Sequence, residues 1–245
     1  MCVAAIAWAA HPDWQLIALA NRDEFHTRPA APLVRWDNGI LAGRDLKSGG
    51  SWLGVCDEGR IALVTNRRGF GDPQADKASR GALVCDLLTA SGSYGDVQKA
   101  ELQDFNPFNL FFADQTSACL LSNRPDDQRT ALTPGIYGLS NGALDEPWPK
   151  AVQLNAALGD WLDAGSGDAT ALFAALASEN LPTTGASSAA EGAATPIFVR
   201  NGSYGTRCSS VIMVNCHGEG QFFERRFDSG GSETGETKLA FSWAG

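Results

Sequence analysis

The first ten residues, MCVAAIAWAA, are apolar at nearly every position. In a β-strand, successive side chains point to opposite faces, so the two alternating sets can be considered separately. One set is Cys2, Ala4, Ile6 and Trp8, and the other is Val3, Ala5, Ala7 and Ala9. Because both sets are apolar, we expect a strand over 2–9 with both faces covered. A sheet between a second sheet and a layer of helices provides that environment.

The remaining hydrophobic patterns predict further strands in adjacent pairs, with helices between groups of pairs. The strands are expected at 2–9, 14–20, 51–56, 60–66, 108–114, 117–122, 206–215, 219–227 and 238–243. The helices are expected at 80–90, 94–102, 149–163 and 168–178, with Pro149 at a helix start. This order favours an α+β fold of mainly antiparallel sheets flanked by helices over alternating parallel units.

The composition fits one globular domain covering 1–245. With 245 residues, of which 44% are hydrophobic and 19% charged, the chain can bury a sizeable core. The stretch 183–195, TTGASSAAEGAAT, is predicted to be a loop within that domain and not a boundary.

The net charge of -9 and the pI near 4.8 argue against binding to nucleic acid or anionic membranes, because phosphate binding needs clustered Lys and Arg. A small-molecule partner is therefore favoured. We expect no integral membrane segment, since no stretch approaches the roughly 20 apolar residues that a spanning helix needs.

The cysteines indicate a reducing compartment. The six cysteines are scattered, form no CxxC pair and occur in a chain too large to need a disulfide framework, so we predict free thiols in the cytoplasm. No basic residue precedes the apolar start, and HPDW at 11–14 interrupts it with a turn, which argues against a signal peptide. The three histidines have no metal-site spacing, so no metal centre is predicted.

The turn at HPDW predicts a hairpin that brings two unusual features together. A turn around His11 to Asp13 pairs positions symmetrically, so Cys2 should face the 21–23 region. That region belongs to ANRDEF at 20–25, which sets an amide, a guanidinium and two carboxylates side by side after an apolar run. Residues directly opposite each other in such a pair lie roughly 5 Å apart.

A cysteine beside this cluster suggests an N-terminal nucleophile. Removal of Met1 would leave Cys2 with a thiol and a free α-amine, which titrate at about 8.5 and about 7.7–8.0 in ordinary peptides, so the amine can take the thiol proton. Arg22 could favour the thiolate, and Asp23 could orient the ammonium. Asn66, at the end of a predicted strand, and Asn141, in YGLSNG, are candidate donors to an oxyanion.

Structural interpretations of the same residues remain open. Most cysteines are small buried hydrophobic residues, and NRDE could form a salt-bridge cluster at a strand end. Arg207 and Arg225 could bind a carboxylate substrate, or could form ion pairs with Glu224 or Asp45. In EPWPK at 146–150, Trp148 is expected to pack in the core beside a helix start.

Seven blocks of sequence, in the same order, resemble the NRDE family, also called the transport and Golgi organisation protein 2 family. The blocks include NRDEF, GRDLKSGGSWLGV at 43–55, GLSNGALDEPWPK at 138–150, YGTRCSSV at 204–211 and FFERRFD at 222–228. Members begin Met-Cys, as this chain does. The resemblance implies a four-layer αββα sandwich of the N-terminal-nucleophile hydrolase type.

The resemblance also implies where a ligand would bind. In conjugated bile acid hydrolases and penicillin V acylases, a cysteine follows the excised Met, and an Arg and an Asp end the second strand. Those two residues are separated by two positions, whereas Arg22 and Asp23 are adjacent, so either Asp23 or Glu24 could orient the amine. Further candidates for substrate binding are Asn21, His26, Arg44, Trp52, Arg207 and Arg225.

Three functions follow from these residues. The first is hydrolysis of an amide or thioester in a small molecule by Cys2, without a cofactor. The second, also implied by the family, is a carrier of haem or an acyl ligand in the same cavity, with His26 as a possible axial ligand to haem. The third is a scaffold with a vestigial site.

Overall fold

The computed structural model describes residues 2–143, 146, 148–181 and 195–243. The chain divides into two compact units, Met1–Thr27 with Pro134–Ala240, and Arg28–Thr133 with Phe241–Gly245, called unit 1 and unit 2 below. The loop predicted over 183–195 lies, apart from Thr195, outside the described residues. The expectation of a single domain stays a prediction.

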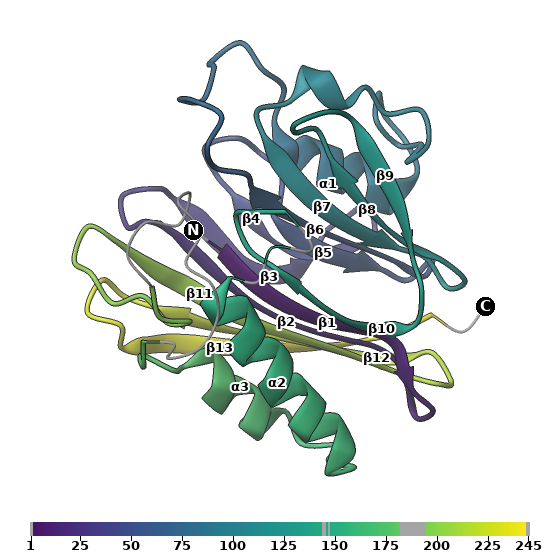
Figure 1. Cartoon of the computed structure of the whole chain (residues 1–245), viewed down its shortest axis with the longest axis vertical. Coiled ribbons are helices and arrows are strands. Elements are labelled where there is room, and N and C mark those ends of the chain that lie inside the picture. Colours follow the sequence, from purple (N-terminus) through teal and green to yellow (C-terminus); the bar gives the residue numbers. More distant parts are fainter. Residues whose placement is uncertain (1, 144–145, 147, 182–194, 244–245) are drawn as a thin grey trace. The chain divides into compact units, whose positions relative to one another are not determined.

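Unit 1 is built on a six-stranded sheet with the order β10-β1-β2-β11-β12-β13 (Figure 1). Its strands are β1 (Cys2–His11), β2 (Trp14–Phe25), β10 (Gly135–Leu139), β11 (Tyr204–Asn215), β12 (Glu219–Phe227) and β13 (Glu233–Ser242). β1 pairs antiparallel with β10 and β2, and β11 pairs antiparallel with β2 and β12. β1 therefore lies within the sheet, between β10 and β2.

Two helices cover one face of this sheet, α2 (Pro149–Asp163) and α3 (Ala169–Leu176) (Figure 1). Odd-numbered residues of the first two strands, among them Val3, Ala5 and Leu19, share a buried core with Leu154 of α2 and Phe173 of α3. Pro149 occupies the first turn of α2, where its missing N–H costs no hydrogen bond. Even-numbered residues of β1 and β2 consequently face away from the helices.

Unit 2 is built on a seven-stranded sheet in sequence order, from β3 to β9. Its strands are β3 (Ala30–Arg35), β4 (Ile40–Asp45), β5 (Leu53–Cys56), β6 (Arg60–Asn66), β7 (Phe108–Ala113), β8 (Ala118–Ser122) and β9 (Gln128–Leu132). The helix α1 (Arg80–Thr89) packs on it, with Leu83 and Leu87 in a core shared with Ala62 and Leu110. A 3-10 helix, η1, follows at Leu102–Asp104.

All nine predicted strands are observed, and the helices predicted at 80–90, 149–163 and 168–178 are observed to within two residues. The prediction of a helix over 94–102 is wrong. There the Asp96 side chain accepts a hydrogen bond from the Gln98 N–H at 2.9 Å, and its carbonyl accepts from Lys99 and Ala100. Local bonding of this kind offers the backbone a turn in place of a helix.

The second strand is longer than predicted. β2 continues through ANRDEF to Phe25, so the polar cluster lies inside a strand and does not follow one. Four strands, β3, β4, β9 and β10, were not predicted; β3, β9 and β10 lie at sheet edges, where few residues are buried. Within the described residues, no helix is long and apolar enough to cross a membrane.

Candidate functional site

The first β-hairpin brings the start of the chain to the polar cluster. Cys2 lies directly opposite Arg22, and Val3 lies opposite Asn21. The predicted meeting of Cys2 with the 21–23 region is thereby confirmed. It follows from the short connection between His11 and Trp14, because a tight turn fixes the register of both strands.

Arg22 is flanked by a thiol on each side. β11 pairs with the other edge of β2, and there Cys208 lies opposite Arg22 and also opposite Arg226 of β12. Directly paired residues share a face, so Cys2, Arg22, Cys208 and Arg226 form a row across four strands, on the face away from the helices. We call these four residues the Cys2 row.

The two thiols of the row differ in access. Cys2 is partly accessible, whereas Cys208 is buried, and burial raises the pKa of the Cys208 thiol. A thiol held in its protonated form is a poor nucleophile. Cys2 is therefore the thiol of this row that can react.

Arg22 is itself buried, with 8% of its surface exposed. Glu24, two residues along β2 on the same face, places a carboxylate oxygen 3.7 Å from the Arg22 guanidinium. Arg226 donates a hydrogen bond to Glu224 at 3.3 Å and to Thr237 at 2.8 Å. Each guanidinium in the row thus has a carboxylate beside it, and Glu24 shares the Cys2 face.

The Asn21 side chain points to the opposite face of the sheet and forms a hydrogen bond to the end of α3. Its amide nitrogen donates to the carbonyls of Leu176 at 2.8 Å and Ile197 at 3.0 Å, and its oxygen accepts from the Ser209 hydroxyl at 2.6 Å. These bonds satisfy a completely buried side chain. The geometry gives Asn21 a structural role and does not bring it to the thiol.

Asp23 lies on the same face as Asn21 and is also buried. Its carboxylate accepts from the Thr206 hydroxyl at 2.7 Å, and its backbone carbonyl accepts from the Tyr204 hydroxyl at 3.0 Å. Burial raises the pKa of Asp23 to about 6, against the opposing effects of Lys150, the Thr206 hydrogen bond and Arg22. The carboxylate therefore titrates close to neutral pH.

The chain after β10 reaches Cys2 from the other side. Leu139 lies opposite Ala4, and Ser140 donates its hydroxyl hydrogen to the Cys2 carbonyl at 2.9 Å. Asn141 follows directly and is buried. The structure thus brings the predicted oxyanion donor Asn141 into the neighbourhood of Cys2.

The side chains of Arg207 and His26 contact backbone carbonyl groups around the end of β2. Arg207 lies at a register shift between Thr206 and Cys208, and it donates to the carbonyls of Phe25 at 3.0 Å and His26 at 3.3 Å. A ring nitrogen of His26, Nε2, lies 3.0 Å from the Asn201 carbonyl oxygen. Both side chains are close to the site in sequence, but their bonds go to backbone carbonyls.

Arg225 is not brought to Cys2. It lies opposite Ser209, on the face that carries the helices, with its guanidinium 4.0 Å from the Phe173 ring centre and bonded to Glu236 at 2.5 Å. The ion pair considered for Arg225 with Glu224 or Asp45 is replaced by one with Glu236, and the one considered for Arg207 stays a prediction. Sequence spacing does not distinguish the two faces of neighbouring strands when a bulge intervenes.

Three predicted residues belong to unit 2. The Arg44 guanidinium lies 3.9 Å from the Trp36 ring centre, Trp52 packs partly buried against the core around α1, and Asn66 is exposed at the end of β6. Their suggested roles at the Cys2 site stay predictions.

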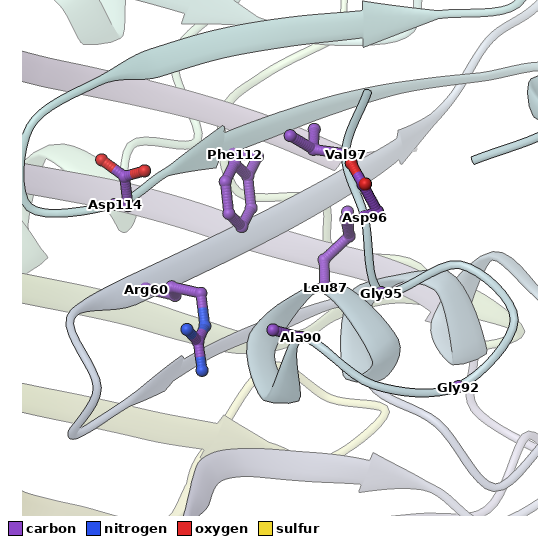
Figure 2. Close-up of a pocket in the computed structure, with 9 residues that line it drawn as sticks. All are labelled: Arg60, Leu87, Ala90, Gly92, Gly95, Asp96, Val97, Phe112 and Asp114. Atoms are coloured by element: carbon purple, nitrogen blue, oxygen red, sulfur yellow. The ribbon is translucent and has the colours of Figure 1, made fainter. Parts of the chain in front are cut away.

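Unit 2 also contains a cavity of about 490 Å³ between α1, β6, β7 and the segment after α1 (Figure 2). Leu87 and Phe112 contribute apolar side chains to its lining, and Asp96, Asp114 and Arg60 contribute charged ones. The Arg60 Nε already donates to the Leu88 carbonyl at 2.7 Å. None of the residues predicted for the Cys2 site lines this cavity.

Sequence reasoning missed Ser140, Thr206 and Lys150. Each is buried and lies beside a predicted residue, but an isolated hydroxyl or a lysine in a helix start gives no pattern that could be recognised. Among the described residues, no group of three or more His, Cys, Asp or Glu side chains is arranged to hold a metal ion.

Comparison with known proteins places the chain in a family. The model of the family described as Transport and Golgi organisation 2 matches residues 1–229. The chain belongs to this family. A mouse relative named Transport and Golgi organization 2 homolog is 34% identical over 241 residues, covering 86% of each chain. The human homolog is 34% identical over 247 residues, again covering 86% of each.

Solved structures give the fold of this Transport and Golgi organisation 2 family member. It is similar to a conjugated bile acid hydrolase from Clostridium perfringens, solved as the mutant C2A, with a TM-score of 0.57, 10% sequence identity and coverage of 97% of this chain and 92% of that one. A second variant of the same hydrolase gives a TM-score of 0.54 at 10% identity, covering 98% and 92%. The α+β fold predicted from the sequence, of N-terminal-nucleophile hydrolase type, is confirmed.

Proposed function

We propose that the protein is a hydrolase that uses Cys2, freed by removal of Met1, to cleave an amide or thioester bond in a small molecule. The observation that carries this proposal is the register of the first hairpin, which sets a partly accessible thiol beside the buried Arg22 guanidinium. A positive charge beside a thiol favours the thiolate.

Arg22 and Asp23 act on different atoms of Cys2. The thiol lies on the face that carries Arg22, whereas the α-nitrogen belongs to the backbone and lies in the plane of the sheet. Val3 lies opposite Asn21 and Cys2 lies opposite Arg22, so the next position in this register is Asp23. Because the α-nitrogen precedes the α-carbon of Cys2 in the chain, it points toward the level of Asp23. Arg22 therefore serves the thiol, and Asp23, although on the other face, serves the amine.

The reaction follows from these positions. The neutral α-amine takes the thiol proton, and the thiolate attacks the carbonyl carbon of the substrate. The negative charge that develops on the carbonyl oxygen is stabilised by an amide donor, for which Asn141 of unit 1 is the candidate. The leaving amine or thiol takes the proton from the ammonium, and a water molecule then hydrolyses the acyl-Cys2 thioester.

The structural neighbour supports the reaction class. The conjugated bile acid hydrolase was solved as the mutant C2A, so its natural chain also has a cysteine at position 2. The free state of all six cysteines supports a reducing compartment, and we place the protein in the cytoplasm.

The alternative function is a carrier of haem or an acyl ligand, and the experiment must distinguish it from a hydrolase. Haem ligation by His26 Nε2 would have to replace its contact with the Asn201 carbonyl. Binding by a carrier requires neither a reactive thiol nor removal of Met1.

An acylating probe tests the proposal. The starting material is protein whose measured mass shows that Met1 has been removed. It is treated with an activated acyl thioester, and the acylated residue is mapped by peptide mass spectrometry. We expect stoichiometric acylation at Cys2, its loss in Cys2→Ala, and no loss in Cys216→Ala, which removes an exposed thiol elsewhere in unit 1.

Two outcomes would refute the hydrolase. One is Met1 retained in protein made in cells, since the amine would then be blocked. The other is acylation that continues undiminished in Cys2→Ala. Saturable one-to-one binding of haemin, abolished by His26→Ala but not by Cys2→Ala, would favour the carrier in its place.

A further inference from the structure

Two sequence motifs, NRDEF at 21–25 and YGTR at 204–207, lie side by side on β2 and β11, with Thr206 opposite Asp23. Asp23 is held at two points. The Tyr204 hydroxyl donates a hydrogen bond to its backbone carbonyl at 3.0 Å, and the Thr206 hydroxyl donates one to its carboxylate at 2.7 Å. Both the main chain and the side chain of Asp23 are therefore bonded to β11.

A third segment directs the hydrogen of the Thr206 hydroxyl toward Asp23. The Val199 N–H donates to the Thr206 hydroxyl oxygen at 2.9 Å, and the Thr206 N–H donates to the Val199 carbonyl at 2.8 Å. An ionised carboxylate can only accept, so the single hydroxyl hydrogen goes to Asp23. A Cβ at Gly205 would lie 2.6 Å from the Val199 carbonyl oxygen, and glycine at this position permits the close approach.

The contact between the hydroxyl and the carboxylate is buried. Asp23 has 4% and Thr206 has 1% of its surface exposed. A hydrogen bond to a charged group is stronger than one between neutral groups, and it holds the carboxylate in one orientation. Burial raises the pKa of Asp23, and the Thr206 hydrogen bond opposes that rise. The hydroxyl therefore favours both the position and the charge of the carboxylate.

We propose that Thr206 is a positioning residue for the nucleophile, because its hydroxyl fixes the Asp23 carboxylate that serves the α-amine of Cys2. This inference rests on the proposed function. It connects the YGTR motif to the site through Thr206 and not through Arg207, whose bonds go to backbone carbonyls.

A fixed carboxylate beside the α-amine should raise the pKa of that amine, because a negative charge favours the ammonium. Without the Thr206 hydroxyl, the carboxylate loses its orientation and its own pKa rises further, so less negative charge faces the amine at neutral pH. The pKa of the amine should then fall. A hydrogen bond that served stability alone would alter the free energy of unfolding and leave the pKa of the amine unchanged.

The charges around the carboxylate are the same in all variants of Thr206. Lys150 from α2 and Arg22 from β2 act on it as positive charges. Next to Arg22, on the other face of the sheet, lie Glu24 of β2 and the Cys208 thiol of β11. A difference between these variants therefore reports the hydroxyl.

The experiment measures the titration midpoint of the Cys2 α-amine by NMR, from the nitrogen chemical shift of protein without Met1 that contains isotope-labelled cysteine. For Thr206→Val we expect the midpoint to fall by about 0.5–1 pH unit. Thr206→Ser keeps the hydroxyl and should keep the wild-type midpoint. Asp23→Asn should lower the midpoint by at least as much, and adding Thr206→Val to it should cause no further change.

Ser209→Ala is the matched control. It removes another buried hydroxyl of β11, which donates a hydrogen bond to Asn21 Oδ1 at 2.6 Å. We expect this variant to lower the free energy of unfolding and to leave the amine midpoint unchanged. Equal shifts in Ser209→Ala and Thr206→Val would overturn the inference, since the effect would then be a general loss of packing.

An unchanged amine midpoint in folded Thr206→Val would also overturn it. If Thr206→Val does not fold, Thr206→Ala takes its place, and an unchanged midpoint in Asp23→Asn would be equally decisive because the carboxylate would then have no effect on the amine. The acyl probe tests the proposed function separately. Acylation of Cys2 with an unchanged midpoint would retain the hydrolase and remove the role of Thr206, whereas a shifted midpoint in a protein that the probe never acylates would do the reverse.

Discussion

Asn21 and Asp23 are two residues apart in the NRDE motif and point to the same face, but the chemistry of their side chains gives them different roles. The amide of Asn21 has neutral donors and acceptors that match two carbonyls and a hydroxyl. The carboxylate of Asp23 is ionisable and buried, and burial raises its pKa to about 6. We therefore expect Asn21 to contribute to the free energy of unfolding at every pH, and Asp23 to make that free energy depend on pH.

Replacing Asn21 by Ala should destabilise the protein by about 2–4 kcal/mol, because two carbonyls and the Ser209 hydroxyl lose a buried partner at once. Urea unfolding of the variant measures this loss. The matched control is Asn38→Ala, an exposed turn residue, for which we expect less than about 0.5 kcal/mol. Equal effects at the two positions would contradict the structural role of Asn21.

Asp23 should make the protein less stable as pH rises. Its pKa is about 6 in the folded chain against an ordinary value of 3.8, so ionisation is harder in the folded state than in the unfolded state. The contribution is present at low pH and is lost as pH rises through about 6. Relative to Asp23→Asn, the wild type should lose about 2 kcal/mol between pH 4 and pH 7.

The comparison with Asp23→Asn isolates this one group. Carboxylates whose pKa values are lowered, such as Asp45 and Asp114, change stability in the opposite direction but do so equally in both proteins. Denaturant unfolding at several pH values gives the difference. A difference that stays constant with pH would show that Asp23 ionises normally.

At the scale of elements, β2 is the strand on which the site depends. It has β1 on one side and β11 on the other, and its end is held by Arg207 at the register shift in β11. A bulge re-aims the side chain that it displaces, which explains why Arg207 reaches the carbonyls of Phe25 and His26.

Arg207→Ala should therefore loosen the end of β2. We expect the amides of residues 24–27 to lose protection from hydrogen exchange by about tenfold, equivalent to one ordinary hydrogen bond. The control is Arg225→Ala, which removes an arginine from the same unit whose bonds go to Glu236. Equal loss of protection in both variants would show that the effect is not local.

Elements with a continuous buried face could be predicted from sequence, and the others could not. β7 has six buried residues and is predicted within one residue, whereas β9 is almost wholly exposed and gives no periodic signal. β2 was predicted to end at Ala20 because Asn21 to Glu24 are polar. Their burial depends on partners from α2, α3 and β11 that local sequence does not reveal.

At the scale of the whole molecule, thiol access distinguishes the proposed nucleophile from the other cysteines. All six cysteines are free, with Cys216 exposed, three partly accessible and Cys56 and Cys208 buried. Burial raises the pKa of Cys56 to about 11, which further slows its reaction.

A thiol titration with an aromatic disulfide checks this order. In denaturant without reductant all six thiols should react, and in the folded protein Cys216 and Cys2 should react before Cys56 and Cys208. Fewer than six thiols in denaturant would indicate a disulfide and would argue against a reducing compartment.

The sequence by itself determined the α+β class, the family and the meeting of Cys2 with Arg22. These depend on hydrophobic periodicity and on a short turn, which act between residues close together in the chain. Only the tertiary structure decided that Asn21 and Asp23 point to the helices, that Cys208 flanks Arg22, and that Thr206 donates a hydrogen bond to Asp23. Those arrangements join segments more than a hundred residues apart. A polar side chain that is buried there must be hydrogen-bonded, and a local sequence pattern does not show which distant residue will be its partner.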